Sequence, residues 1–474
     1  MLVRQLYDND LAQAAYLIGC QRTGEAIVID PERDVDRYLA LAAENEMRLV
    51  AAAETHIHAD FLSGSRELAH RAGVHAYLSA EGGDDWQYGW PAADRGVSHT
   101  LLRDGDTFRI GELRFVAQHT PGHTPEHLSY VLYDRGSDDP LAVLSGDFVF
   151  VGDLGRPDLL ETAAGMAGMK ESAARALYAS TKRLMELPEF TQVWPAHGSG
   201  SACGKALGAV PQSTVGYEKR HNASLLAATD ETNFVSSILA GQPSPPLYFA
   251  RMKHDNRDGP PLLGSLPEPE EISAGALTSA TYDGAVLDLR PWTSFRDGHT
   301  PGALWSPLDV MFGMVAGSYI QPEERITLVC EPSQLDRAVR NLVRIGLDRV
   351  EAWVPAASIA PLGDALETTP EMTPADLLAQ LGTPAVLDCR NPDEHDAGAP
   401  PAAFNIPYTR LTPRLDDLPR DRAVVCHCLT GIRSAAATAY LRREGFDVIN
   451  LRGGIEAWEE AGGPVETPAA AAGA

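Results

Sequence analysis

Two imidazoles and a carboxylate stand close together in the stretch ETHIHADFLSG, residues 54–64. His56, His58 and Asp60 occupy alternate positions after the apolar run 49–53, which predicts a buried strand that ends at these side chains. Neutral imidazole and carboxylate are ligands of zinc and of non-haem iron(II). The motif therefore predicts a metal site, and the alternative for the motif alone is a solvated polar loop.

Three further strand-like runs each lead into a residue of the ligand type. Residues 113–117 precede His123, residues 141–144 precede Asp147, and residues 190–194 precede His197. Rigid strands position functional groups on the loops that follow them. Four such strand ends, in order along the chain, predict that these side chains meet in one metal centre.

The ordered motifs resemble the signature of the metallo-β-lactamase superfamily over residues 1–235. This resemblance implies an α/β fold, an αββα sandwich, for that part of the chain. One position departs from the pattern, because Phe61 stands where hydrolytic members such as glyoxalase II have a histidine that helps to hold a second metal ion. Phenylalanine cannot bind a metal, so the departure argues against a full two-metal site.

The chain resembles the persulfide dioxygenases, the subgroup that works with one iron, more than it resembles the hydrolytic members. The resemblance implies one Fe(II) per chain, which zinc can replace on purification, with the ligands His56, His123 and Asp147. Two histidines and one carboxylate form the facial triad of non-haem iron oxygenases. The other polar residues of the motifs would orient the ligands or hold water: His58, Asp60 and His197.

Two residues near these motifs are candidates for substrate contact. The turn GRPD is similar to the family's GRTD, and this similarity implies that Arg156 lies near the thiol substrate, where its guanidinium suits the anionic groups of glutathione or coenzyme A. The alternative is a surface arginine at a turn. Cys203, six residues after His197 in a Gly/Ser loop, could carry or donate sulfur, or could be an ordinary loop residue.

A second reactive centre is predicted at Cys428, which lies between an apolar strand, residues 423–426, and a helix near residues 434–443. A turn from strand to helix directs backbone N–H groups and the positive end of the helix at the thiol, and Arg433 adds a full charge. Such surroundings favour the thiolate, which is the nucleophilic form. Cys426, within the apolar strand, is expected in the core.

Residues 371–464 resemble a rhodanese, a sulfurtransferase module, through the pattern C-x4-R and the later run NLRGGIEAW. The resemblance implies that Cys428 accepts a sulfane sulfur as a persulfide. Residues 285–307 and 385–407 match at nine of 23 positions, which indicates a duplicated α/β unit. Aligning Cys330 with Cys426 places Pro332 at the position of Cys428, so residues 273–365 are expected to be a degenerate, structural rhodanese domain.

Composition limits the remaining possibilities. The 474 residues carry a net charge of −26, which argues against nucleic acid or an anionic membrane as partner. No apolar run is long enough to span a membrane, and the six cysteines form no disulfide framework, so we expect a cytoplasmic protein. Proline-rich residues 236–272 are expected to be a linker, and residues 465–474 a flexible tail.

These resemblances together imply a persulfide dioxygenase fused to a sulfurtransferase. Its partners would be O₂, small-molecule thiols and low-molecular-weight persulfides of the glutathione or coenzyme A type, and its products sulfite, thiosulfate or both. Two alternatives stay open: a thioester hydrolase similar to glyoxalase II, and a sulfur carrier or sensor. The sequence leaves the carrier thiol, the order of the steps and a homo-oligomeric state undecided.

Overall fold

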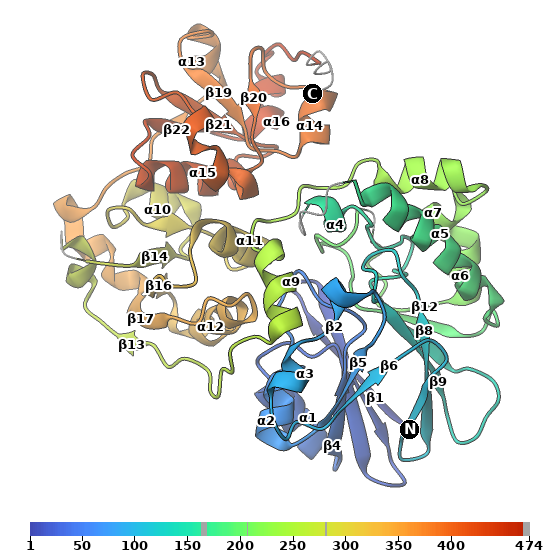
Figure 1. The fold of residues 1–474 in the computed structure, drawn as a ribbon. Helices are drawn as coiled ribbons and strands as arrows, with labels where there is room; N and C mark the ends of the chain where they lie inside the picture. Colours follow the sequence, from blue (N-terminus) through green and yellow to red (C-terminus); the bar gives the residue numbers. More distant parts are fainter. Residues whose placement is uncertain (163–167, 206, 280–281, 468–474) are drawn as a thin grey trace. The chain divides into compact units, whose positions relative to one another are not determined.

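The computed structural model describes residues 1–162, 168–205, 207–279 and 282–467 (Figure 1). The chain forms two compact units, Met1–Leu266 with Val343–Gly346 and Pro267–Leu342 with Leu347–Ala474. Residues 468–474, most of the predicted tail, lie outside the described residues. The predicted fold class is confirmed: an αββα sandwich followed by two rhodanese-like α/β sheets.

Two six-stranded sheets form the centre of the first unit. The strands of the first sheet, in spatial order, are β1 (Leu2–Asp8), β2 (Gln13–Cys20), β3 (Glu25–Ile29), β4 (Arg48–Ala53), β5 (His75–Ser79) and β6 (His99–Leu102). Those of the second sheet are β12 (Ser213–Thr214), β11 (Gln192–Pro195), β10 (Ala142–Gly146), β9 (Leu128–Tyr133), β8 (Leu113–His119) and β7 (Thr107–Ile110).

Helices cover both outer faces of this sandwich, with α1 and α2 on the first sheet and α5 to α8 on the second (Figure 1). Alternate residues of the facing strands, such as Ile27, Phe115 and Tyr130, bury their side chains between the sheets. The helices are α1 (Asp36–Glu44), α2 (Ser65–Ala72), α3 (Trp90–Ala93), α4 (Leu159–Thr162), α5 (Lys170–Glu186), α6 (Val215–His221), α7 (Ala223–Leu226), α8 (Glu231–Leu239) and α9 (Phe249–Asp258).

The second unit contains two five-stranded sheets with the same strand order. The first has β13 (Glu270–Glu271), β17 (Val350–Pro355), β16 (Ile326–Cys330), β14 (Ala285–Asp288) and β15 (Leu304–Trp305), with α10 (Trp292–Asp297), α11 (Val310–Tyr319) and α12 (Leu335–Arg344). The second has β18 (Glu371–Met372), β22 (Val448–Leu451), β21 (Val424–His427), β19 (Ala385–Asp388) and β20 (Phe404–Asn405), with α13 (Pro374–Ala379), α14 (Pro392–Ala397), α15 (Ile432–Arg443) and α16 (Gly454–Glu460).

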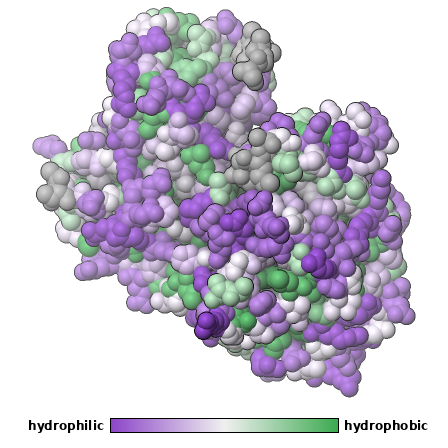
Figure 2. Space-filling model, viewed as in Figure 1, coloured by the Kyte–Doolittle hydropathy of each residue, from purple (hydrophilic) through white to green (hydrophobic). Residues whose placement is uncertain are grey.

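Short 3₁₀ helices complete the described structure: η1 (Asp84–Trp86), η2 (Ala274–Thr278), η3 (Pro332–Gln334), η4 (Ala356–Ser358), η5 (Ala360–Ala365), η6 (Tyr408–Arg410) and η7 (Thr412–Asp417). Within the described ranges, no helix is both long and apolar enough to cross a bilayer. The face in Figure 2 is mainly hydrophilic with scattered apolar residues, as expected for a chain with a net charge of −26.

Candidate functional site

Loops at the carboxyl ends of β4 and β10, and the loop after β8, bring three of the predicted ligands together. Potential ligand atoms of His56, His123 and Asp147 all lie within 4.8 Å of one another, and all three residues are buried. His123 Nε2 is 3.4 Å from Asp147 Oδ2. The strand-end pattern in the sequence therefore corresponds to one compact cluster in space.

The chemistry of this cluster fits a divalent cation. Nδ1 of His56 lies 2.9 Å from Thr55 Oγ1, and Nδ1 of His123 lies 3.1 Å from the carbonyl oxygen of Arg156, so each ring can use Nε2 as a ligand. Burial and the neighbouring imidazoles lower the pKa of His56 well below its usual value, which keeps the ring neutral. Both carboxylate oxygens of Asp147 are buried without a hydrogen bond, as a metal-binding carboxylate requires.

His58 lies beside this cluster rather than in it. Its Nε2 is 3.0 Å from Glu54 Oε2 and 3.3 Å from Asp30 Oδ1. Burial opposes a charge on the ring, but the hydrogen bonds and charges of the two carboxylates outweigh it and raise the pKa of His58 well above its usual value. The sequence reasoning missed Asp30 and Glu54, although Asp30 follows β3 directly, which is the signal that identified the other ligands.

Asp60 and His197 gather in a second buried cluster with Cys203. Nε2 of His197 is 3.2 Å from Asp60 Oδ2 and 3.4 Å from Asp147 Oδ1. Burial raises the pKa of the Cys203 thiol to about 12. This cluster therefore lies next to the first one, and the Asp147 carboxylate stands between them, with one oxygen near His123 and the other near His197.

Arg156 is fully buried, and its guanidinium forms hydrogen bonds with other residues of the protein. It donates to both carboxylate oxygens of Asp158, at 2.9 and 2.6 Å, and to the carbonyl oxygens of Ala202, at 2.9 Å, and Pro243, at 2.6 Å. These bonds attach the loop of Cys203 to the turn after Asp147. Direct contact of Arg156 with a substrate stays a prediction.

In the second unit, β21 ends immediately before Cys428, and α15 begins just after Gly431. The N–H of Gly431 donates to Cys428 Sγ at 3.1 Å, and the hydroxyl of Ser434 lies 3.6 Å from the same sulfur. Gly431 has φ 92°, a conformation that favours glycine and turns its N–H toward the thiol. The backbone thus provides a hydrogen-bond cradle for a sulfur anion.

Arg433 forms two parallel hydrogen bonds, both 2.7 Å, with Glu394. The sequence reasoning missed this glutamate, which the capping box of α14, Asn391 with Glu394, could have indicated. The pair holds Arg433 beside the loop and offsets part of its charge. Leu429 and Ile432, one and four residues after the buried Cys428, are apolar and 40% exposed.

Strand register corrects the predicted alignment of the two copies. Asp288 pairs with Val329 and Asp388 with His427, so Cys330 occupies the position of Cys428, and the alignment of Cys330 with Cys426 is wrong. The following turn is built differently, because Glu331 N–H donates to Gln334 Oε1 at 2.9 Å in the capping box of η3. Burial, with the charges of Glu331 and Asp288, raises the pKa of Cys330 to about 12, which keeps it a thiol.

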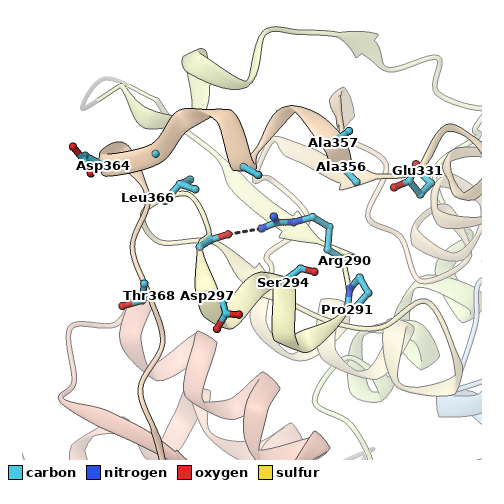
Figure 3. A pocket seen from close by; sticks show the side chains of 13 residues that line it. Arg290, Pro291, Ser294, Asp297, Glu331, Ala356, Ala357, Asp364, Leu366 and Thr368 are labelled. Atoms are coloured by element: carbon cyan, nitrogen blue, oxygen red, sulfur yellow. Dashed lines mark hydrogen bonds between the residues drawn. The ribbon is translucent and has the colours of Figure 1, made fainter.

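An open cleft of about 810 Å³ lies beside this turn (Figure 3). Arg290 faces it, but its guanidinium donates to Asp288 and to the carbonyl oxygen of Gly298. The carboxylates Asp297, Glu331 and Asp364 also line the cleft. With the arginine paired and three acids around it, this cleft does not suit an anion.

Comparison with known proteins agrees with both parts of the fold. Residues 8–197 match the metallo-beta-lactamase superfamily model and residues 373–461 the rhodanese-like domain model. A crystal structure described as a metallo-beta-lactamase from Staphylococcus aureus subsp. aureus COL is 37% identical, with a TM-score of 0.68, and the match covers 75% of this chain and 99% of that one.

Curated relatives match the two parts separately. The human mitochondrial persulfide dioxygenase ETHE1 is 28% identical over 200 residues, 42% of this chain and 68% of the relative. A sulfurtransferase from Allochromatium vinosum is 40% identical over 92 residues, 19% of this chain and 86% of the relative. The chain spans 62% of the length of another curated relative, a beta-lactamase hydrolase-like protein.

Proposed function

Because the chain belongs to the metallo-β-lactamase superfamily and carries a rhodanese-like domain, we propose that it is a persulfide dioxygenase and sulfurtransferase. It oxidises low-molecular-weight persulfides of the glutathione or coenzyme A type to sulfite, thiosulfate or both, in the detoxification of sulfide. The observation that carries the proposal is the buried triad His56, His123 and Asp147, two imidazoles and one carboxylate from three separate loops. The similarity to a persulfide dioxygenase supports it.

Iron(II) held by this triad would supply the activation of O₂. The protein's own residues prepare the site. Asp30 accepts a hydrogen bond from Thr55 Oγ1 at 2.9 Å, and Thr55 in turn lies against Nδ1 of His56, so the ring is fixed in one orientation. The burial of all three ligands keeps bulk water from the reacting sulfur.

Cys428 performs the sulfur transfer in this proposal. Its thiolate attacks the outer sulfur of a persulfide RSSH, the S–S bond breaks, and RS⁻ leaves and takes up the proton as RSH. The N–H of Gly431, 3.1 Å from the sulfur, stabilises the anion. Sulfite then attacks the outer sulfur of the Cys428 persulfide, which releases thiosulfate and regenerates the thiolate.

The proposed substrates are small molecules rather than nucleic acids, and we place the protein in the cytoplasm.

One observation favours a second candidate, a thioester hydrolase similar to glyoxalase II. Asp60, His197 and Cys203 lie where a second metal ion could bind next to the triad, and hydrolytic enzymes often use two ions. A thioester such as S-lactoylglutathione would then be cleaved without consumption of O₂. Oxygen uptake with a persulfide and hydrolysis of this thioester therefore separate the two functions.

The experiment uses the full chain with an oxygen electrode and metal analysis. Glutathione persulfide should cause O₂ uptake, and His123→Ala should lose both the uptake and the iron, whereas His254→Ala, at an exposed histidine, should keep both. Cys428→Ser should stop sulfur transfer from thiosulfate to cyanide but leave O₂ uptake. Thioester hydrolysis without persulfide-dependent O₂ uptake would refute the dioxygenase proposal.

A further inference from the structure

Asn450 is a buried polar residue inside the apolar strand β22, and no step of the function proposed above uses it. The residue is 1% exposed. On one side β22 pairs with β21, where Asn450 lies opposite Cys426, two residues before Cys428. On the other side β22 pairs with the edge strand β18, where Asn450 lies opposite Glu371. Asn450 therefore lies between the strand that leads into the reactive loop and a carboxylate at the edge of the sheet.

The amide of Asn450 holds two parts of the reactive loop. Its Nδ2 donates to the carbonyl oxygen of Gly431 at 3.2 Å, and its Oδ1 accepts from the hydroxyl of Ser434 at 2.7 Å. Both partners are in contact with the sulfur, because the Gly431 N–H donates to Cys428 Sγ at 3.1 Å and Ser434 Oγ lies 3.6 Å from it. A buried amide that forms both bonds fixes the positions of both groups.

Glu371 determines which way this amide faces. Its Oε1 accepts from Asn450 Nδ2 at 3.4 Å, so the NH₂ group has two acceptors on its side and the amide oxygen faces Ser434. Two donors from α10 of the first copy hold Glu371: Trp292 Nε1 lies 2.7 Å from Oε1, and Arg296 Nη1 lies 2.7 Å from Oε2. Burial opposes the charge of Glu371, but these bonds outweigh it and lower the pKa of Glu371, which stays an ionised acceptor.

The two copies differ at this position as their loops differ. Glu271 pairs with Trp353 in the first copy as Glu371 pairs with Asn450 in the second. Trp353 also pairs with the strand residue two positions before Cys330, so it occupies the position of Asn450. Both copies have the glutamate, whereas the amide stands in the copy whose cysteine has a hydrogen-bond cradle.

We propose that Asn450 is a positioning residue for sulfur transfer at Cys428. It holds Gly431 so that the N–H of this residue faces the sulfur, and it holds the hydroxyl of Ser434 beside the same sulfur. When the thiol loses its proton or becomes a persulfide anion, rotation of the hydroxyl brings its hydrogen to the sulfur. Groups that Asn450 positions thus stabilise both sulfur anions of the transfer cycle.

The first copy takes part through the same chain of hydrogen bonds. Trp292 and Arg296 fix Glu371, and Glu371 fixes the amide of Asn450. The inference rests on the proposed sulfur transfer and names residues for it that lie outside the reactive loop.

The test compares two asparagines of the second copy in the full chain. Asn450→Ala should lower kcat/KM for sulfur transfer from thiosulfate to cyanide by about tenfold or more, because Gly431 loses a buried partner. Asn405→Ala is the matched control and should leave kcat/KM almost unchanged, since Asn405 also donates to two carbonyl oxygens, of Asp388 at 2.9 Å and of Arg390 at 2.8 Å. Equal losses in the two variants, or no loss in Asn450→Ala, would overturn the inference.

Alkylation of Cys428 by iodoacetamide, followed by mass spectrometry of its peptide, measures the state of the sulfur without turnover. The thiolate is the reactive form, so Asn450→Ala should move the pH profile of alkylation to higher pH. A profile that does not move would contradict the positioning role. All variants keep the ionisable groups around the sulfur, which are Arg433 with its partner Glu394, Tyr408 and Cys389. If the unmodified chain transfers no sulfur while the profile moves as expected, the proposed sulfur transfer fails and the positioning role stands.

Glu371→Gln keeps the test decisive if Asn450→Ala does not fold. Glutamine has one acceptor oxygen where glutamate has two, so transfer and alkylation should change in the same direction as in Asn450→Ala but less, and no change would overturn the inference. Because Glu371 acts through Asn450, Glu371→Gln should add nothing in the Asn450→Ala background, and additive losses would refute this connection. Trp292→Phe removes the indole N–H and keeps an aromatic ring; an unchanged alkylation profile in this variant would exclude the first copy from the reaction.

Discussion

Replacing Arg156 by lysine separates a structural role from a substrate contact. Lysine keeps the charge but cannot form two parallel bonds with one carboxylate. In the protein, Arg156 makes two buried bonds to Asp158 and one partly buried bond each to the carbonyl oxygens of Ala202 and Pro243, all at 2.6–2.9 Å. We therefore expect Arg156→Lys to loosen the loop of Cys203.

The size of the effect follows from the bonds that are lost. A hydrogen bond to a charged group contributes about 1.5–3 kcal/mol, and a buried carbonyl left without a donor costs about 1–3 kcal/mol. One lost bond of each kind gives a local destabilisation of about 2.5–6 kcal/mol. Arg220→Lys is the matched control, because its pair with Glu189, also 2.7 Å, is exposed. Exposed pairs contribute at most about 1 kcal/mol.

Hydrogen exchange of the peptide that contains residues 198–204 measures this loosening in the full chain. Exchange should be faster by at least about 70-fold in Arg156→Lys, which corresponds to about 2.5 kcal/mol, and almost unchanged in Arg220→Lys. Suppose instead that exchange is unaffected while KM rises for glutathione persulfide but not for a small uncharged persulfide. Arg156 would then bind the carrier, and the structural reasoning would be refuted.

Two further predictions concern a buried carboxyl and the degenerate copy. Burial raises the pKa of Glu126 to about 7, so the folded state binds this proton more tightly than the unfolded chain and stability falls, by roughly 3 kcal/mol at most, as pH rises from about 4.5 to above 7. In urea unfolding, Glu126→Gln should therefore gain stability relative to the unmodified chain over this range, and parallel pH curves would contradict it. Cys330, which occupies the position of Cys428, should support no sulfurtransferase activity in a Cys428→Ser variant, because no glycine lets N–H groups converge between Glu331 and Gln334; thiosulfate-to-cyanide transfer by that variant, lost again on Cys330→Ser, would show a working loop.

The sequence predicted the strand ends that carry the triad because strand patterns and ligand types are local features. The apolar runs before His56, His123 and Asp147 are β4, β8 and β10, with boundaries within two residues of those expected. The partition of the motif residues between two clusters could not be predicted in this way. It depends on which strands are neighbours, since Asp30 reaches His58 only because β3 pairs with β4.

The alignment of the two copies failed for a related reason. Both copies contain the letters Val-Cys at the second strand, and matching them aligns Cys330 with Cys426. The hydrogen-bond register instead aligns Cys330 with Cys428, because the first copy reaches its cysteine two positions later in the strand than Cys426. Sequence identity at one position cannot detect such a slip, whereas strand pairing fixes it.

The Asp–Arg pair that both copies retain has the same geometry whether or not a reactive loop follows. Arg290 donates to Asp288 and the carbonyl oxygen of Gly298, and Arg390 makes the corresponding bonds to Asp388 and Gly398. Because the pair is intact beside the inert Cys330, it holds the turn after the first strand rather than taking part in sulfur transfer.

The first copy packs against the second copy through Tyr319. The ring of Tyr319, at the end of α11, stacks on Tyr440 of α15 with centroids 4.1 Å apart, and its hydroxyl donates to the carbonyl oxygen of Tyr408 at 2.6 Å. Helix α15 follows the Cys428 loop directly, so a fixed α15 also fixes the Gly431 N–H that donates to the sulfur. This contact needs the fold of the first copy but not an anion cradle in it.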